Sequence, residues 1–220
     1  MPAYAIIARV LGAMLRILVV ALVVLVAAMF LLPRPERGAP PQAATVLPAP
    51  RELADVRFVG TDGSEKRFAD FEGNYTLLFF GFTNCPDVCP LTLQVLATAR
   101  AEIARRAPQL TPRVLFVSVD PSRDTPERIA AYVHGFDAAF EGVTAPDAEL
   151  KPLLAALGVA VEKHEHGGAN YTVVHNSAIY VLDANADWVA VTTGPHDPAV
   201  VASDFLRIRR RTSGGPPPDA

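Results

Sequence analysis

Long hydrophobic runs alternate with amphipathic stretches through the middle of the chain. The segments YTLLFF (75–80) and RVLFVSV (113–119) are apolar at nearly every position, a pattern typical of strands covered on both faces of a sheet. A helical stretch from about Pro90 to Arg106 lies between them. Together the three segments predict a βαβ unit.

Turn and cap signals place further elements on either side of this unit. Before it, VRFV (56–59) and the run at 66–68 flank Asp62-Gly63, which predicts a β-hairpin. After it, a helix is expected to open at Thr125-Pro126-Glu127, because Thr125 can cap it and proline suits its first turn. Another helix, AELKPLLAAL, should end at Gly158, a residue type common just after helices.

The chain closes with short β-rich stretches and a helix. YTVVH, SAIYVLD and WVAVTT have the composition of strands, and a last helix is expected from Val200 to Ile208. Parallel strands joined by a crossover, followed by a β-rich end and a helix, indicate an α/β fold of the thioredoxin-like kind. The hairpin should precede its core.

A different hydrophobic pattern occupies the N-terminus. Residues 17–32 read ILVVALVVLVAAMFLL without a charge, and a helix that starts near Val10 would be long enough to span a bilayer. We predict that residues 1–32 form a single transmembrane helix, a signal anchor with its N-terminus inside. The alternative is a cleaved signal peptide, with a small-residue site at Val26-Ala27-Ala28. Both interpretations export the rest of the chain.

Composition then divides the remainder. Residues 33–50 carry six prolines among alanines, so 33–52 are interpreted as an extended linker. The folded domain is expected over 53–211, about 160 residues and enough for one α/β domain. A disordered tail is expected at 212–220. The formal net charge of −3, with no basic cluster beyond Arg207–Arg211, argues against nucleic acid as a partner.

The candidate chemistry lies in GFTNCPDVCPLTL (81–93), between a predicted strand and its helix. Cys85 and Cys89 are the only cysteines of the chain. A helix N-terminus stabilises thiolates and lowers their pKa. In a helical turn, a spacing of four would put both sulfurs on one face, where they could hold one soft metal ion, Cu(I) or zinc, or form a disulfide. A purely structural disulfide is the alternative.

Two stretches of the chain, FFGFTNCPDVCPLTL (79–93) and VLFVSVDPSRDTPERI (114–129), closely resemble the signature motifs of the Sco/SenC family. The resemblance implies a thioredoxin-like fold and one copper ion held by Cys85, Cys89 and His175. It also implies a role in assembling the binuclear copper (CuA) centre of cytochrome c oxidase. The partner would be the copper-bearing oxidase subunit, which would receive copper, have its cysteines reduced, or both. The copper donor and the thiol reductant remain unidentified.

His175 ends the YTVVH stretch. Its neighbours Val174 and Asn176 depart from the family pattern, which commonly has Asp before the histidine and Ser or Thr after it. This departure bears on the groups that orient the ligand more than on ligation. The alternative to ligation is that His175 is an ordinary strand histidine, either hydrogen-bonded within the protein or exposed at the surface.

Three aspartates are candidates for orienting the ligands or a docking partner. Asp87 lies between the cysteines, and Asp120 and Asp124 follow the next strand, whose carboxyl end should face the same crevice as the cysteine turn. The alternative for these residues is ordinary turn and cap chemistry.

Two functions from different classes follow. The first is a membrane-anchored copper metallochaperone. The second is a thiol-disulfide oxidoreductase, in which the cysteine pair attacks a partner disulfide; a peroxidase of the same fold is disfavoured because the local pattern differs. The short leader leaves no room for a transit peptide. We therefore expect a single-pass protein of a bacterial inner membrane with its domain in the periplasm.

Overall fold

The computed structural model describes residues 14–16, 18–22, 39–165, 171–175 and 177–212, without the side chains of 162–165 and 171–175. It divides the chain into two units, 1–37 and 38–220. In the first unit, residues 14–16 and 18–22 are helical. The parts of the chain that are described contain no helix with the length and hydropathy needed to cross a bilayer. Most of the predicted anchor lies outside them, as does nearly all of the predicted tail.

The second unit is an α/β fold. Its elements are β1 (Thr45–Arg51), β2 (Phe58–Gly60), β3 (Glu65–Lys66), η1 (Phe68–Phe71), β4 (Thr76–Gly81), α2 (Val88–Arg106), η2 (Pro108–Leu110), β5 (Arg113–Ser118), α3 (Pro126–His134), β6 (Glu141–Thr144), α4 (Asp147–Leu157), β7 (Val161–Glu165), β8 (Tyr171–His175), β9 (Ile179–Leu182), β10 (Trp188–Thr192) and α5 (Pro198–Thr212).

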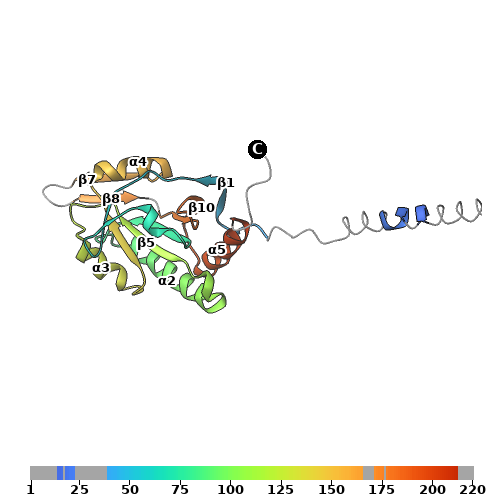
Figure 1. The fold of residues 1–220 in the computed structure, drawn as a ribbon. Helices are drawn as coiled ribbons and strands as arrows, with labels where there is room; N and C mark the ends of the chain where they lie inside the picture. The colour runs from blue at the N-terminus through green and yellow to red at the C-terminus, as the bar shows by residue number, and fades with distance from the viewer. Residues whose placement is uncertain (1–13, 17, 23–38, 166–170, 176, 213–220) are drawn as a thin grey trace, which may run out of the picture. The chain divides into compact units, whose positions relative to one another are not determined.

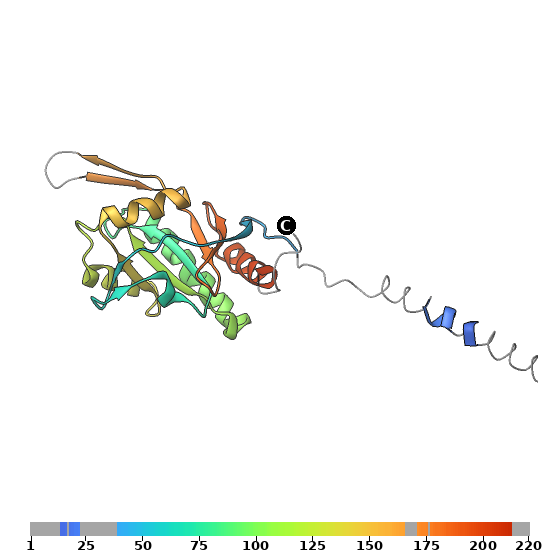
Figure 2. The same cartoon turned by 45° about the horizontal axis from the view of Figure 1, so that its top comes forward.

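One mixed sheet organises this unit (Figure 1). Its strand order is β1-β10-β9-β4-β5-β6-β2-β3. The central pairs β4–β5 and β5–β6 are parallel, which confirms the predicted βαβ unit, whereas β9 joins β4 from the other side in antiparallel fashion. β7 and β8 pair with each other outside this sheet, and Figure 2 shows them beside α4.

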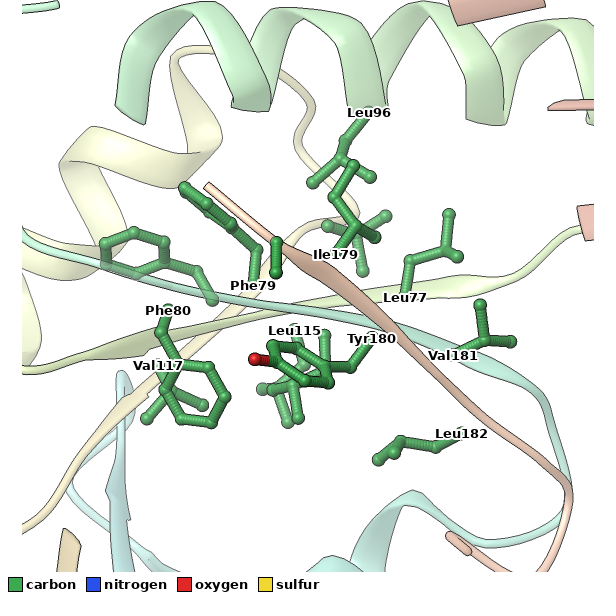
Figure 3. Close-up of a cluster of buried hydrophobic side chains, with 14 of the residues drawn as sticks. Leu77, Phe79, Phe80, Leu96, Leu115, Val117, Ile179, Tyr180, Val181 and Leu182 are labelled. Atoms are coloured by element: carbon green, nitrogen blue, oxygen red, sulfur yellow. The ribbon is translucent and has the colours of Figure 1, made fainter. Parts of the chain in front are cut away.

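Helices cover both faces of the sheet. α2 and α5 pack together on the face that carries Leu77, Phe79 and Ile179, while Phe80 and Tyr180 point to the other face (Figure 3). α4 covers that other face, where the Tyr180 hydroxyl donates to the carbonyl oxygen of Leu157 at 3.1 Å. β4 and β5 are buried on both sides, which explains why their sequences show no polar alternation.

Several local predictions are confirmed. Thr125 caps α3, accepting the backbone N–H of Arg128 at 3.3 Å, and Pro126 is the first helical residue. α4 ends at Gly158, whose φ of 68° lies in the left-handed region that a residue without a Cβ adopts at little cost. The hairpin forms around Asp62-Gly63, with Phe58 opposite Lys66.

The structure differs from the sequence analysis at the start of the domain. Part of the predicted linker forms β1, which pairs with β10 at the edge of the sheet. The boundary at residue 53 is therefore wrong, since proline-containing sequence is tolerated on an edge strand. β6 and β7, which were not predicted, have only four and five residues, so neither gives a clear periodic pattern.

A buried carboxylate fixes the beginning of the domain. Asp204 on α5 is 3% exposed and accepts the backbone N–H groups of Gln42, Ala43 and Ala44 at 2.6, 2.8 and 3.0 Å. Arg207, one turn along the helix, lies 3.5 Å from the same carboxylate. This clamp explains why the folded unit begins well before the predicted boundary.

Candidate metal centre

The two cysteines lie in the turn between β4 and α2. The helix was predicted from about Pro90, and α2 begins at Val88. Cys89 is therefore helical while Cys85 lies in the preceding turn, so the two cysteines do not share a helical turn. The turn still brings them together, because the backbone N–H of Cys89 donates to Cys85 Sγ at 3.4 Å. Both cysteines are thiols rather than halves of a disulfide.

The two sulfurs differ in exposure. Cys89 is fully buried, whereas Cys85 is half-buried. Val88 and Leu91, in the first two turns of α2, are 37% and 62% exposed, and we call these two side chains the apolar rim. A ligand or partner that approaches the pair from solvent meets Cys85 before Cys89.

The environment raises the pKa of the Cys89 thiol. The hydrogen bond with Cys85 is the largest cause and burial is the second, while the backbone of Phe82 acts in the opposite direction. The helix N-terminus was expected to lower this pKa, and that expectation is wrong for Cys89. Desolvation and a neighbouring sulfur outweigh the helix dipole where water is excluded.

Gly81, the last residue of β4, permits this close packing. A Cβ at this position would lie 2.7 Å from Cε2 of Phe116, 3.0 Å from Sγ of Cys89 and 3.2 Å from Cε1 of Phe79. A side chain here would force these neighbours to shift. Glycine therefore leaves the space that the Cys89 sulfur and the Phe116 ring need at the end of β4.

Asp124 braces the cysteine turn. Its carboxylate, 1% exposed, accepts the backbone N–H of Thr83 at 2.9 Å and the Thr83 hydroxyl at 2.6 Å. It also accepts the hydroxyl of Ser118, at the end of β5, at 2.6 Å. The adjacent carboxyl ends of β4 and β5 are thus joined through one side chain, and Asp124 positions the turn without facing solvent.

The other two candidate aspartates have different surroundings. Asp120 is fully buried and pairs with Arg123 Nε at 2.5 Å, and Arg123 lies over the Phe82 ring at 5.9 Å. Asp87 occupies the N-cap position of α2 but makes no capping hydrogen bond through its side chain, and it is exposed. A role for these residues in orienting ligands stays a prediction.

The sequence analysis missed three polar residues near the cysteines. Thr83 and Ser118 hold Asp124, and Tyr132 on α3 lies close enough for the charges of Cys89, Cys85 and Asp124 to raise its pKa, after burial as the larger cause. Serine and threonine are so common near strand ends that their residue type alone does not mark them as part of a site. Tyr132 is far along the chain from both cysteine positions.

His175 is the last residue of β8, opposite Val161 on β7. Its side chain lies outside the described part of the structure. Among the side chains that are described, no three histidines, cysteines or carboxylates form a cluster able to hold a metal. Copper ligation by Cys85, Cys89 and His175 therefore stays a prediction.

This arrangement supports two kinds of chemistry. Two sulfurs in one turn, one of them reachable from solvent, are soft donors that suit a monovalent copper or a zinc ion. The same pair can be oxidised to a disulfide across a short turn. In either case the metal ion or the reacting partner meets Cys85 first, because Cys85 is the more exposed of the two sulfurs.

Comparison with known proteins helps to decide between metal binding and disulfide chemistry. A sequence profile described as SCO1/SenC matches residues 47–209. The Arabidopsis thaliana protein SCO1 homolog 1, mitochondrial, is 33% identical over 137 residues, which cover 62% of this chain and 40% of that protein. The chain thus matches less than half of that relative's length.

Solved structures are also similar. The crystal structure of Arabidopsis thaliana ScoI with copper bound is 29% identical, with a TM-score of 0.67 over 72% of this chain and 98% of the other. The structure of Bradyrhizobium japonicum ScoI with copper bound is 29% identical, with a TM-score of 0.63 over 71% and 98%. These likenesses confirm the predicted thioredoxin-like architecture.

Proposed function

The chain belongs to the SCO1/SenC family, and from that premise we propose that it is a copper metallochaperone that carries one copper ion on Cys85 and Cys89. The observation that carries the proposal is the cysteine turn itself. One sulfur is buried against β4 and the other is half-buried beside an apolar rim. A buried donor retains an ion, and a reachable one allows it to be passed on.

The donor set fits copper as a cargo. Thiolates select Cu(I) over hard cations such as magnesium and calcium. The solved structures of Arabidopsis thaliana ScoI and Bradyrhizobium japonicum ScoI have copper bound. His175, the last residue of β8, is proposed as the third ligand. A three-coordinate site would leave room for a thiolate of the acceptor to enter, so that copper moves by ligand exchange.

The cellular setting is part of the proposal. We place the N-terminal hydrophobic segment in a bacterial inner membrane and the folded unit in the periplasm, on the basis of the uncharged run at 17–32. The acceptor would be the copper-bearing subunit of cytochrome c oxidase, where the ion would contribute to the CuA centre.

Metal analysis of the full chain tests this function. The protein, purified in detergent and reduced, should bind one Cu(I) per chain, and Cys85→Ser and Cys89→Ser should each lose it. His175→Ala should weaken retention against a copper chelator. Gln94→Ala, an exposed residue of α2 to which no role in the site is assigned, is the control and should bind normally. Normal copper retention by both cysteine variants would refute the proposal.

The exposure difference between the sulfurs also favours a second function, reduction of the acceptor's disulfide. The Cys85 thiolate would attack one sulfur of that disulfide, forming a mixed disulfide and releasing the other sulfur as a thiolate. Cys89 would then attack Cys85, so the pair is oxidised by two electrons and the acceptor gains both. His175→Ala separates the functions: loss of copper with reductase activity retained favours the chaperone, and the reverse favours the oxidoreductase.

A further inference from the structure

Tyr132 places a polar atom in the apolar interior behind the cysteine turn. Its hydroxyl oxygen is buried, and within the described residues it has no hydrogen-bond partner. Its ring, by contrast, is well packed, with edge-to-face contacts to Phe116 at 5.8 Å and to Phe136 at 5.4 Å between centroids. A buried hydroxyl without a partner is costly, and phenylalanine could supply the same packing.

The surroundings of this hydroxyl point to the sulfurs. Phe116, which contacts the Tyr132 ring, also lies near Cys89: its Cε2 and the Cys89 Sγ are 2.7 and 3.0 Å from the position that a Cβ of Gly81 would take. Phe116 pairs with Phe79 across β5 and β4, and Gly81 follows Phe79 by two residues, on the same face. Tyr132 and Cys89 therefore lie on one face of the sheet. The charge of Cys89 is the strongest charge effect on the pKa of Tyr132, ahead of Cys85 and Asp124.

We propose that Tyr132 is a positioning residue whose hydroxyl donates a hydrogen bond to the cysteine pair when its sulfurs are thiolates, as they are when they hold copper. A thiol is a weak acceptor, whereas hydrogen bonds to an ionised acceptor are short and strong. The bond therefore forms on loading, and the hydroxyl stabilises negative charge on a sulfur that burial otherwise disfavours.

This inference rests on the proposed copper function, and it predicts how the site is tuned. A donor to a thiolate withdraws electron density from sulfur and favours the more electron-rich Cu(I) state. Tyr132→Phe should leave the fold intact, since both ring contacts remain. It should shift the equilibrium between bound Cu(I) and Cu(II) about tenfold toward Cu(II), or about 59 mV for one electron. The sulfur-to-copper absorption band should move to lower energy.

The experiment compares the full chain with Tyr132→Phe and Tyr180→Phe, in detergent, by redox titration and absorption spectroscopy of the copper form. Tyr180 is the matched control, because its hydroxyl already donates to Leu157 on the opposite face of the sheet. Its variant should lose stability but keep the wild-type potential and band. A purely structural Tyr132 would leave both readouts unchanged, and that result would overturn the inference, as would an equal shift in Tyr180→Phe.

A second measurement keeps the two proposals distinct. The copper-free cysteine pair is equilibrated with dithiothreitol at defined ratios and at alkaline pH, where the reduced pair carries a thiolate. Tyr132→Phe should then favour the disulfide severalfold over wild type, since the thiolate loses its donor. If the wild-type chain takes up no copper, the proposed function fails and this equilibrium decides the role of Tyr132. A variant equilibrium equal to wild type would then reject that role.

Discussion

Replacing Asp124 with alanine should release the cysteine turn and lower stability measurably. The carboxylate is buried and accepts three hydrogen bonds, two from Thr83 and one from Ser118. Hydrogen bonds to charged groups contribute about 1.5–3 kcal/mol each. Even at the lower value, three of them predict a loss of about 4.5 kcal/mol in the free energy of unfolding, a large part of the total for a domain of this size.

The assay is urea unfolding of the full, reduced chain in nonionic detergent, with linear extrapolation to water. Asp124→Asn should lose less than the alanine variant, because an amide keeps one oxygen for two of the donors and the Thr83 hydroxyl can reverse its role. Asp87→Ala is the control. Its side chain is exposed and makes no capping bond, so its change should stay within about 0.5 kcal/mol. A loss below about 1 kcal/mol for Asp124→Ala would refute the brace.

Three further predictions concern other parts of the domain. Gly81→Ala should cost about 1–3 kcal/mol by urea unfolding, because the added methyl group meets the Phe116 ring and the Cys89 sulfur at 2.7 and 3.0 Å; wild-type stability would contradict it. Leu91→Ser should keep copper content and stability while slowing copper transfer to a purified oxidase copper subunit severalfold; an unchanged rate would exclude this rim from docking. Asp204→Ala frees the three amides it holds, so limited proteolysis should cut the start of the domain faster, with equal rates counting against the clamp.

The strongest sequence signals were those with a local physical cause. The uninterrupted apolar runs of β4 and β5, the cap at Thr125 and the left-handed residue at Gly158 all depend on a few neighbouring residues, and the structure confirms each. The first residue of α2 was predicted less well: the helix was expected from about Pro90 but begins at Val88 and so includes Cys89. Nothing in CPDVCP marks at which of these residues the helix starts.

What could not be predicted depends on contacts between distant segments. β1 is a strand because β10 offers it an edge and Asp204 anchors the residues before it, neither of which is visible in its proline-containing sequence. The rise in the pKa of Cys89 likewise follows from burial against β4 and from its partner sulfur. The placement of Tyr132 behind the cysteines requires the packing of α3 on the sheet.

The clamp at Asp204 also bears on the order in which the domain matures during synthesis. Its carboxylate is 160–162 residues away in sequence from the three backbone N–H groups that donate to it. These hydrogen bonds can therefore form only after almost the whole chain has been synthesised. Chains fold as they emerge, N-terminal segments first. Here the opening segment can take its final position only last, when α5 has been synthesised, and until then the edge of β10 stays open to other strands.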